Sequence, residues 1–159
     1  MARKILGIDP GLRITGYAVL LNKKSGIEIL DAGVLRTKTE GSFESRLLEL
    51  YDSLEEVIKE HKPDSMSVEK LYSHYNHPQT AVVMGHARGA IFLCAAKHGV
   101  PVESYASTRI KKSLTGNGRA SKLQMQRTVK SIFGMKEIPK PPDVADAIAA
   151  ALCHLEAER

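Results

Sequence analysis

The sequence predicts an α/β protein whose centre is a five-stranded mixed sheet with helices on its faces. Three strand patterns separated by short turns fill the first 36 residues, which is typical of antiparallel strands. Two further strand patterns then alternate with long helical patterns, and a strand reached through a helix is naturally parallel to an existing one. The chain has 159 residues with no internal repeat and no long linker, so we expect one domain over residues 1–159.

Each predicted strand is a short apolar run bounded by turn residues. The first, residues 5–8, is unbroken and therefore fits a strand that is buried on both faces. It ends at Asp9, and a Pro-Gly pair then turns the chain away. The predicted strands cover residues 5–8, 14–21, 27–36, 65–69 and 100–105.

The predicted helices follow from apolar positions spaced by three and four residues and from signals at their ends. The clearest helix begins after Ser42, which can cap it, and has Glu44 near the positive end of its dipole. Pro78 begins the next helix, and Gly99 ends it. The predicted helices cover residues 43–61, 78–98, 108–114, 121–133 and 143–158.

Bulk composition narrows the class of partner and the compartment. The formal net charge of +5 favours a polyanionic partner such as nucleic acid. The two cysteines, Cys94 and Cys153, lie among alanines and leucines in helical patterns, so we expect small buried side chains rather than a disulfide or a zinc site. With no signal peptide and no apolar run long enough to span a bilayer, we expect a cytoplasmic protein without membrane contact.

Four carboxylates stand at positions that the predicted fold can bring together. Asp9 and Glu69 each end a predicted strand, and Asp143 and Asp146 are three residues apart on one face of the last helix. Each has an ordinary explanation, since surface acids are solvated and an aspartate at a helix start caps free N–H groups. If the last helix begins across the two strand ends, however, all four share one small volume.

Four neighbouring carboxylates repel one another, so some of their pKa values must rise unless a cation compensates the charge. Oxygen-only ligands of this kind suit Mg²⁺ or Mn²⁺. Two ions about 4 Å apart can hold a scissile phosphate and stabilise both the attacking and the leaving oxygen. In a basic protein, this chemistry favours cleavage of a nucleic-acid backbone.

Five short motifs occur in a fixed order along the chain. They are Gly7-Ile8-Asp9-Pro10-Gly11 with Thr15-Gly16-Tyr17, Val68-Glu69-Lys70-Leu71-Tyr72, Gly85-His86-Ala87-Arg88-Gly89, Gly116-Asn117-Gly118 before Lys122, and Pro142-Asp143-Val144-Ala145-Asp146-Ala147. In this order and at these separations, they resemble the RuvC-type Holliday-junction resolvases of the ribonuclease H-like superfamily. The resemblance covers nearly the whole chain.

The resemblance implies a ribonuclease H-like fold and a metal-dependent endodeoxyribonuclease of homologous recombination and DNA repair. The family's catalytic, metal-binding acids correspond to Asp9, Glu69, Asp143 and Asp146, with two Mg²⁺ ions per active site and Mn²⁺ as a substitute. It also implies a homodimer that nicks two opposed strands of a four-way junction symmetrically, leaving 5′-phosphate and 3′-hydroxyl ends. A branch-migration motor is a further partner that the resemblance suggests.

The same resemblance indicates residues that contact DNA. Tyr72 takes the place of a family aromatic that stacks on bases at the crossover, and Lys111 and Lys122 match family lysines. Lys112 and Arg119 lie beside them in the sequence and complete a basic cluster around a Gly-rich loop. The alternatives are that Tyr72 anchors its own loop and that each basic residue is an ordinary solvated charge.

Two other functions remain open at this point. A related ribonuclease H-like nuclease could act on RNA or on other branched DNA, because such enzymes use similar acids. A module that binds junctions without cutting them is the alternative from another class, and the complete set of four acids argues against it.

Overall fold

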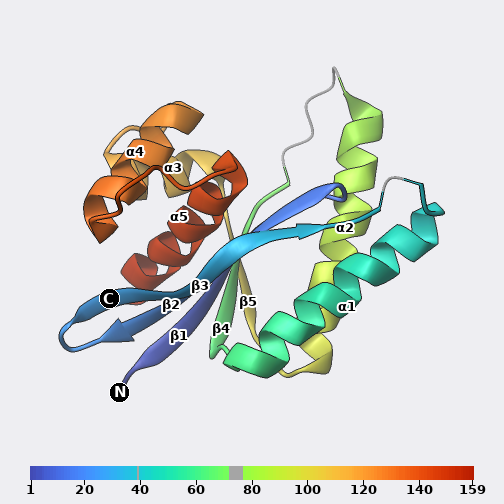
Figure 1. Cartoon of the computed structure of the whole chain (residues 1–159), viewed down its shortest axis with the longest axis horizontal. Coiled ribbons are helices and arrows are strands. Elements are labelled where there is room, and N and C mark those ends of the chain that lie inside the picture. Colours follow the sequence, from blue (N-terminus) through green and yellow to red (C-terminus); the bar gives the residue numbers. More distant parts are fainter. Residues whose placement is uncertain (39, 72–76) are drawn as a thin grey trace.

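The computed structural model describes residues 1–38, 40–71 and 77–159, and its five strands form one sheet in the order β3-β2-β1-β4-β5 (Figure 1). The strands are β1 (Arg3–Asp9), β2 (Ile14–Lys23), β3 (Gly26–Arg36), β4 (Ser65–Glu69) and β5 (Val102–Tyr105). The helices are α1 (Phe43–His61), α2 (Pro78–Lys97), α3 (Ser107–Thr115), α4 (Lys122–Phe133) and α5 (Pro142–Ala157). β1 to β3 are antiparallel and β4 and β5 run parallel to β1, so the predicted mixed sheet is confirmed.

β1 lies at the centre of the sheet and is buried on both faces, as predicted. Leu6 and Ile8 point into one apolar cluster, while Ile5 points into another on the opposite face. This alternation follows from the two-residue period of a strand. β1 pairs with β4 in parallel register, with Ile8 opposite Val68, so Asp9 and Glu69 follow at the same edge of the sheet.

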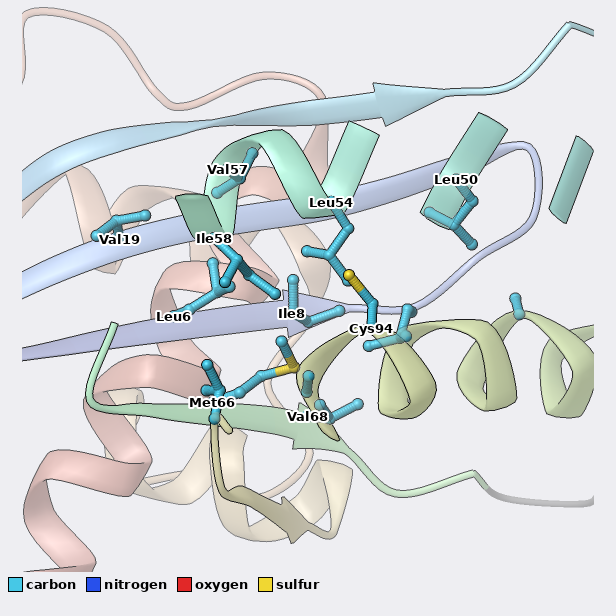
Figure 2. Packing of buried hydrophobic residues seen from close by; sticks show 14 of the residues in the cluster. Leu6, Ile8, Val19, Leu50, Leu54, Val57, Ile58, Met66, Val68 and Cys94 are labelled. Atoms are coloured by element: carbon cyan, nitrogen blue, oxygen red, sulfur yellow. The ribbon is translucent and has the colours of Figure 1, made fainter. Parts of the chain in front are cut away.

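One face of the sheet is covered by α1 and α2 (Figure 1). Large side chains of the strands interlock there with Leu54 and Ile58 of α1 and with Cys94 of α2 (Figure 2). The start of α1 is capped as predicted, because the Ser42 side chain accepts a hydrogen bond from the Ser45 N–H at 3.2 Å. Burial of this apolar surface is the main stabilising contribution on this side.

The opposite face is covered by α5, with α3 and α4 packed beyond it (Figure 1). Unlike α1, α5 approaches the strands closely through its backbone. A Cβ added at Gly7 of β1 would overlap the carbonyl oxygen of Ala147, and one added at Gly16 of β2 would overlap that of Asp143. Because these two glycines have no side chain, the backbone of the first turns of α5 can pack directly against β1 and β2.

The element ends differ from the prediction by one or two residues. β5 begins at Val102 rather than at residue 100, because Pro101 has no N–H to give to the strand ladder. Ser121 caps α4 instead of beginning it. Cys94 and Cys153 are free and buried, as expected. None of the helices in the described part of the chain is long and apolar enough to cross a membrane.

Candidate active site

A pocket of about 420 Å³ opens where β1 and β4 end, and it is lined by all four predicted acids. Asp9 and Glu69 come from the ends of parallel neighbouring strands. Asp143 and Asp146 come from the first turns of α5, with Asp143 directly over β2 at Gly16. The structure thus brings together four residues of which the first and the last, Asp9 and Asp146, are 137 positions apart in the sequence.

Electrostatic strain among the acids is largest at Asp9. Burial, and then the negative charges of Asp146, Glu69 and Asp143, raise the pKa of Asp9 to about 8. Without a cation, the protonated form of this carboxyl is therefore favoured far more than in an ordinary aspartate. The charge of Lys122 opposes the rise but does not cancel it.

Asp146 is shifted in the same direction by a similar set of causes. Burial and the neighbouring charges of Glu69 and Asp143 raise its pKa to about 6, against the opposing charges of Lys122 and Lys111. Two carboxyls with raised pKa values in one polar pocket mark a functional site rather than a set of solvated surface acids.

Basic side chains share the same pocket. Lys111 of α3 and Lys122 of α4 line it, together with Lys70 and Arg88. Lys122 occupies the first turn of α4, where a positive charge is unfavourable to the helix dipole. Such a local conflict with helix stability is expected where a residue serves binding instead.

Three helices also begin at this pocket. Ser107 of α3, Lys122 of α4 and Asp143 of α5 lie in first turns and line its wall. Helix N-termini carry partial positive charge and free N–H groups, which favour anions such as phosphate. The pocket therefore combines acids for cations with basic groups for a phosphate backbone.

The structure does not place the other three predicted DNA-contacting residues in the pocket. Lys112 and Arg119 are exposed and do not line the pocket. Tyr72 lies outside the described residues.

Three further basic or polar residues line the pocket: the sequence left Arg88 open between a DNA contact and a structural ion pair, and it gave no role to Lys70 or Ser107. Arg88 donates a hydrogen bond to the Glu69 carbonyl oxygen and lies 4.9 Å from the centre of the Phe92 ring. Lys70 and Ser107 each follow the end of a parallel strand, and that position was the signal that could have identified them.

The donor set fits a hard divalent cation, although within residues 1–38, 40–71 and 77–159 no three acidic, histidine or cysteine side chains already converge as a closed metal cage. Mg²⁺ does not require such a cage. It keeps several waters and binds through one or two carboxylates together with substrate phosphates. An open pocket with four carboxylates on its wall meets that requirement.

Comparisons with known proteins agree on one family. The family model "Crossover junction endodeoxyribonuclease RuvC" matches residues 5–154. The RuvC protein of Rhodopirellula baltica is 50% identical over 94% of this chain and 84% of its own length. That of Ruminiclostridium cellulolyticum is 43% identical over 98% and 93%. The Thermus thermophilus RuvC structure in complex with a Holliday junction substrate superposes with a TM-score of 0.89 at 30% identity, covering 99% of this chain and 95% of that one.

Proposed function

The chain belongs to the RuvC family of crossover junction endodeoxyribonucleases, and we propose that it resolves four-way DNA junctions by paired, metal-dependent nicks. The observation that carries this proposal is the convergence of four carboxylates and four basic side chains in one pocket at the ends of β1 and β4. The complete acid set favours a cutting enzyme over a module that only binds junctions.

We assign the metal to the acids of the pocket. Asp9, Glu69, Asp143 and Asp146 would hold two Mg²⁺ ions, with Mn²⁺ as a substitute. When bound, such ions supply an activated water and neutralise charge on the leaving oxygen, so that hydrolysis leaves 5′-phosphate and 3′-hydroxyl ends. Because carboxylates bind metal only when deprotonated, the raised pKa of Asp9 means that a metal ion held there would compete with a proton.

The basic residues of the pocket would hold the substrate. Lys111 and Lys122 neutralise backbone phosphates beside the acids, and Lys112 and Arg119 extend the contact along the DNA from their exposed positions. Tyr72 would stack on a base at the crossover. These contacts hold DNA by its backbone and shape, which suits an enzyme that selects a branched structure.

A homodimer would pair two such sites, as the two-fold character of a four-way junction requires. The exposed side of α2 supports this assembly. Val82 and Leu93 are 60% and 64% exposed there, and a Cβ added at Gly89 would meet nothing within 4 Å. Apolar side chains beside a glycine with open space provide a surface for close helix contact between two copies.

We place the activity in the cytoplasm, the compartment that holds the chromosome in bacteria such as the relatives named above. There the enzyme would act in homologous recombination and repair, with a branch-migration motor as a further partner.

The test is cleavage of labelled four-way, three-way, duplex and RNA–DNA hybrid substrates with Mg²⁺, with Asp146→Asn as the inactive control. We expect paired symmetric nicks in the four-way junction only, and ends that DNA ligase can seal. Preferential cutting of the hybrid would instead assign the chain to the RNA-directed alternative. Undiminished cleavage in a chelator would overturn the metal-dependent mechanism.

A further inference from the structure

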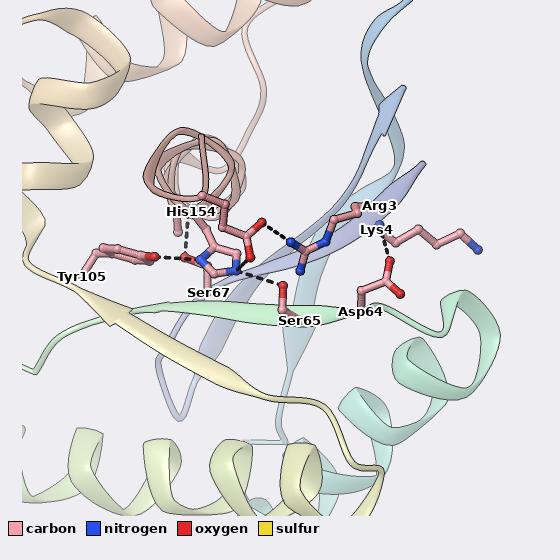
Figure 3. Close-up of polar contacts among 9 residues, drawn as sticks. Arg3, Lys4, Asp64, Ser65, Ser67, Tyr105 and His154 are labelled. Atoms are coloured by element: carbon pink, nitrogen blue, oxygen red, sulfur yellow. Dashed lines mark hydrogen bonds and ion pairs between the residues drawn. The ribbon is translucent and has the colours of Figure 1, made fainter. Parts of the chain in front are cut away.

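A buried polar cluster lies at the opposite end of α5 from the acids and takes no part in the chemistry above. His154 of α5 is 3% exposed, and it lies between Ser65 of β4 and Tyr105 of β5 (Figure 3). Its Nε2 atom is 2.9 Å from the Ser65 Oγ atom, and its Nδ1 atom is 2.7 Å from the Tyr105 hydroxyl. Burying polar side chains between a helix and two strands costs free energy unless each polar group forms its hydrogen bonds.

The hydrogen-bond directions follow from the neighbours. Burial lowers the pKa of His154, so the ring is neutral and carries one N–H. Glu158 presents a carboxylate oxygen 3.3 Å from Nε2, and a carboxylate can only accept. The proton is therefore on Nε2, which donates to Ser65, and Nδ1 accepts from the Tyr105 hydroxyl.

This cluster belongs to the same interface as the catalytic acids. Ser65, Ser67 and Glu69 alternate along β4 and so point to one face, the face that α5 covers. On α5 the facing positions are Asp146, Ala150 and His154, each four residues apart and therefore on one stripe of the helix. The Ser67 hydroxyl donates to the Ala150 carbonyl oxygen at 2.6 Å.

The spacing of the two elements matches over this stretch. From Ser65 to Glu69 a strand advances by roughly 13 Å, and from Asp146 to His154 a helix advances by roughly 12 Å. Strand and helix run in opposite directions, so Ser65 meets His154 and Ser67 meets Ala150, while Glu69 and Asp146 line the same pocket at the other end. A shift at one end of this alignment must appear at the other.

The large side chains of α5, such as Ile148 and Leu152, pack with the apolar cluster of β1 and β2. Near β4 and β5 the side chains of α5 are small, and Ala149, Ala150 and Cys153 share one buried cluster with Tyr105. Small side chains interlock little along a helix axis, whereas hydrogen bonds have a defined length and direction. The repulsion among the acids also acts at the N-terminal end of α5, where it favours separation of Asp146 from Glu69.

We propose that His154, held by Ser65 and Tyr105, is a positioning residue that sets the register of α5 on β4 and thereby the separation of Asp146 from Glu69. The inference rests on the proposed metal-dependent function of those acids. It assigns to the far end of α5 a role in metal affinity and turnover, in addition to its part in stability.

The test compares Ser65→Ala, Tyr105→Phe and His154→Ala with a matched control, His98→Ala. His98 also hydrogen-bonds through its Nε2 atom, to Glu55 at 2.8 Å, but it joins the C-terminal end of α2 to the interior of α1 on the other face of the sheet. Four quantities are measured: Mn²⁺ binding to the DNA-free protein by electron paramagnetic resonance, kcat against Mg²⁺ concentration, junction Kd without metal, and the melting temperature in chelator.

We expect Ser65→Ala and Tyr105→Phe each to raise the Mn²⁺ Kd and lower kcat by about 3- to 10-fold, and His154→Ala by about 10- to 100-fold, since a displacement of about 1 Å can cost about 100-fold. Junction Kd should stay within about twofold. His154→Gln, which retains one of the two hydrogen bonds, should restore part of the loss. The Ser65→Ala and His154→Ala effects should not add, because they remove the same contact.

The possible outcomes distinguish failure of the positioning role of His154 from failure of the proposed metal-dependent function. A wild-type chain that neither binds Mn²⁺ nor cuts junctions would overturn the proposed function itself. A working wild type, with cluster variants that melt lower but bind Mn²⁺ and turn over as His98→Ala does, would reduce His154 to a structural residue. If His154→Ala does not fold, Ser65→Ala and Tyr105→Phe decide the matter in the same assays.

Discussion

The two faces of the central sheet are built by opposite means. On the side of α1 and α2, large apolar side chains such as Leu54 and Ile58 interlock with the strands, and the polar contacts, such as that of His61 with Asp31 at 3.1 Å, lie at the margin of this apolar layer. On the side of α5, alanines and glycines bring helix backbone against strand backbone, and directed hydrogen bonds complete the interface. The first face stabilises the fold, while the second places reactive groups.

The difference has a physical reason. An interlocked apolar layer resists sliding, but the free energy of burial depends on area and sets no direction for any individual group. Carboxylates that bind a metal, as proposed for the acids of α5, must be positioned within fractions of an ångström, so this helix benefits from close backbone contact and hydrogen bonds. The acids lie where the face covered by α5 meets the ends of β1 and β4.

The sharpest separation of the two faces should come from Asp146→Asn. Loss of one metal-binding oxygen charge should lower cleavage by about 1,000-fold or more, while junction binding and folding persist. Removing a repelling charge should even raise the melting temperature in chelator, since burial and Glu69 disfavour the ionised form. A variant with wild-type turnover would exclude Asp146 from the mechanism.

Gly7→Ala should displace α5 from the sheet without creating a cavity in the apolar core. The new methyl group would overlap the Ala147 carbonyl oxygen, so α5 must move away from β1. We expect cleavage to fall by about 100-fold and the free energy of unfolding to fall by only about 1–3 kcal/mol. Steady-state kinetics and urea unfolding on one preparation test this. A cleavage rate close to that of the wild type, together with a loss of stability, would contradict the distinction between the faces.

Leu54→Ala should show the converse pattern. Leu54 is fully buried between α1 and the sheet, so its truncation leaves a cavity and should cost about 2–5 kcal/mol of stability. The molecules that remain folded should cut junctions at nearly the wild-type rate, because the cavity does not touch α5. A large loss of kcat at a temperature where the variant is fully folded would show that both faces position the site.

Stability without metal should fall as pH rises. The pKa of Asp9 is raised to about 8 in the folded chain, against an ordinary value of about 3.9, so the folded state holds this proton more tightly than the unfolded state. Its stabilising contribution is complete below about pH 4 and is lost as pH rises towards 8. The slope is about 1.4 kcal/mol per pH unit while Asp9 alone titrates. Urea unfolding across this range measures it.

Two controls isolate the contribution of Asp9. Asp9→Asn should flatten the slope, and saturating Mg²⁺ should do so as well, because the ion binds the deprotonated form. If the slope in chelator were the same in Asp9→Asn and in the wild type, another group would be responsible for the pH dependence.

Lys122→Ala should have the smallest effect. Removal of one phosphate contact should weaken junction binding a few-fold and reduce the salt dependence of log Kd by about one ion. Lys112→Ala is the comparison: Lys112 belongs to the proposed DNA contact as well, but it is exposed and lies outside the pocket, so its loss should weaken binding less. Fluorescence anisotropy across a salt series compares them. A larger loss from Lys112 would move the DNA path away from the pocket.

Local patterns in the sequence were sufficient for the elements and for the acids. Short apolar runs between turn residues predicted the strands of the described residues, and apolar spacing of three and four predicted the helices, each within two residues. The four acids could be selected because they sit at strand ends and at a helix start, where a charge costs least and a pocket can form.

Only the tertiary structure decided how α5 is held. Gly7 and Gly16 belong to the sequence motifs, but only the structure shows that they leave room for the backbone of α5. His154 lies at the end of an alanine-rich helix, and its partners Ser65 and Tyr105 are 89 and 49 residues away. No local pattern encodes such a contact, because it depends on the angle and register at which two distant elements pack.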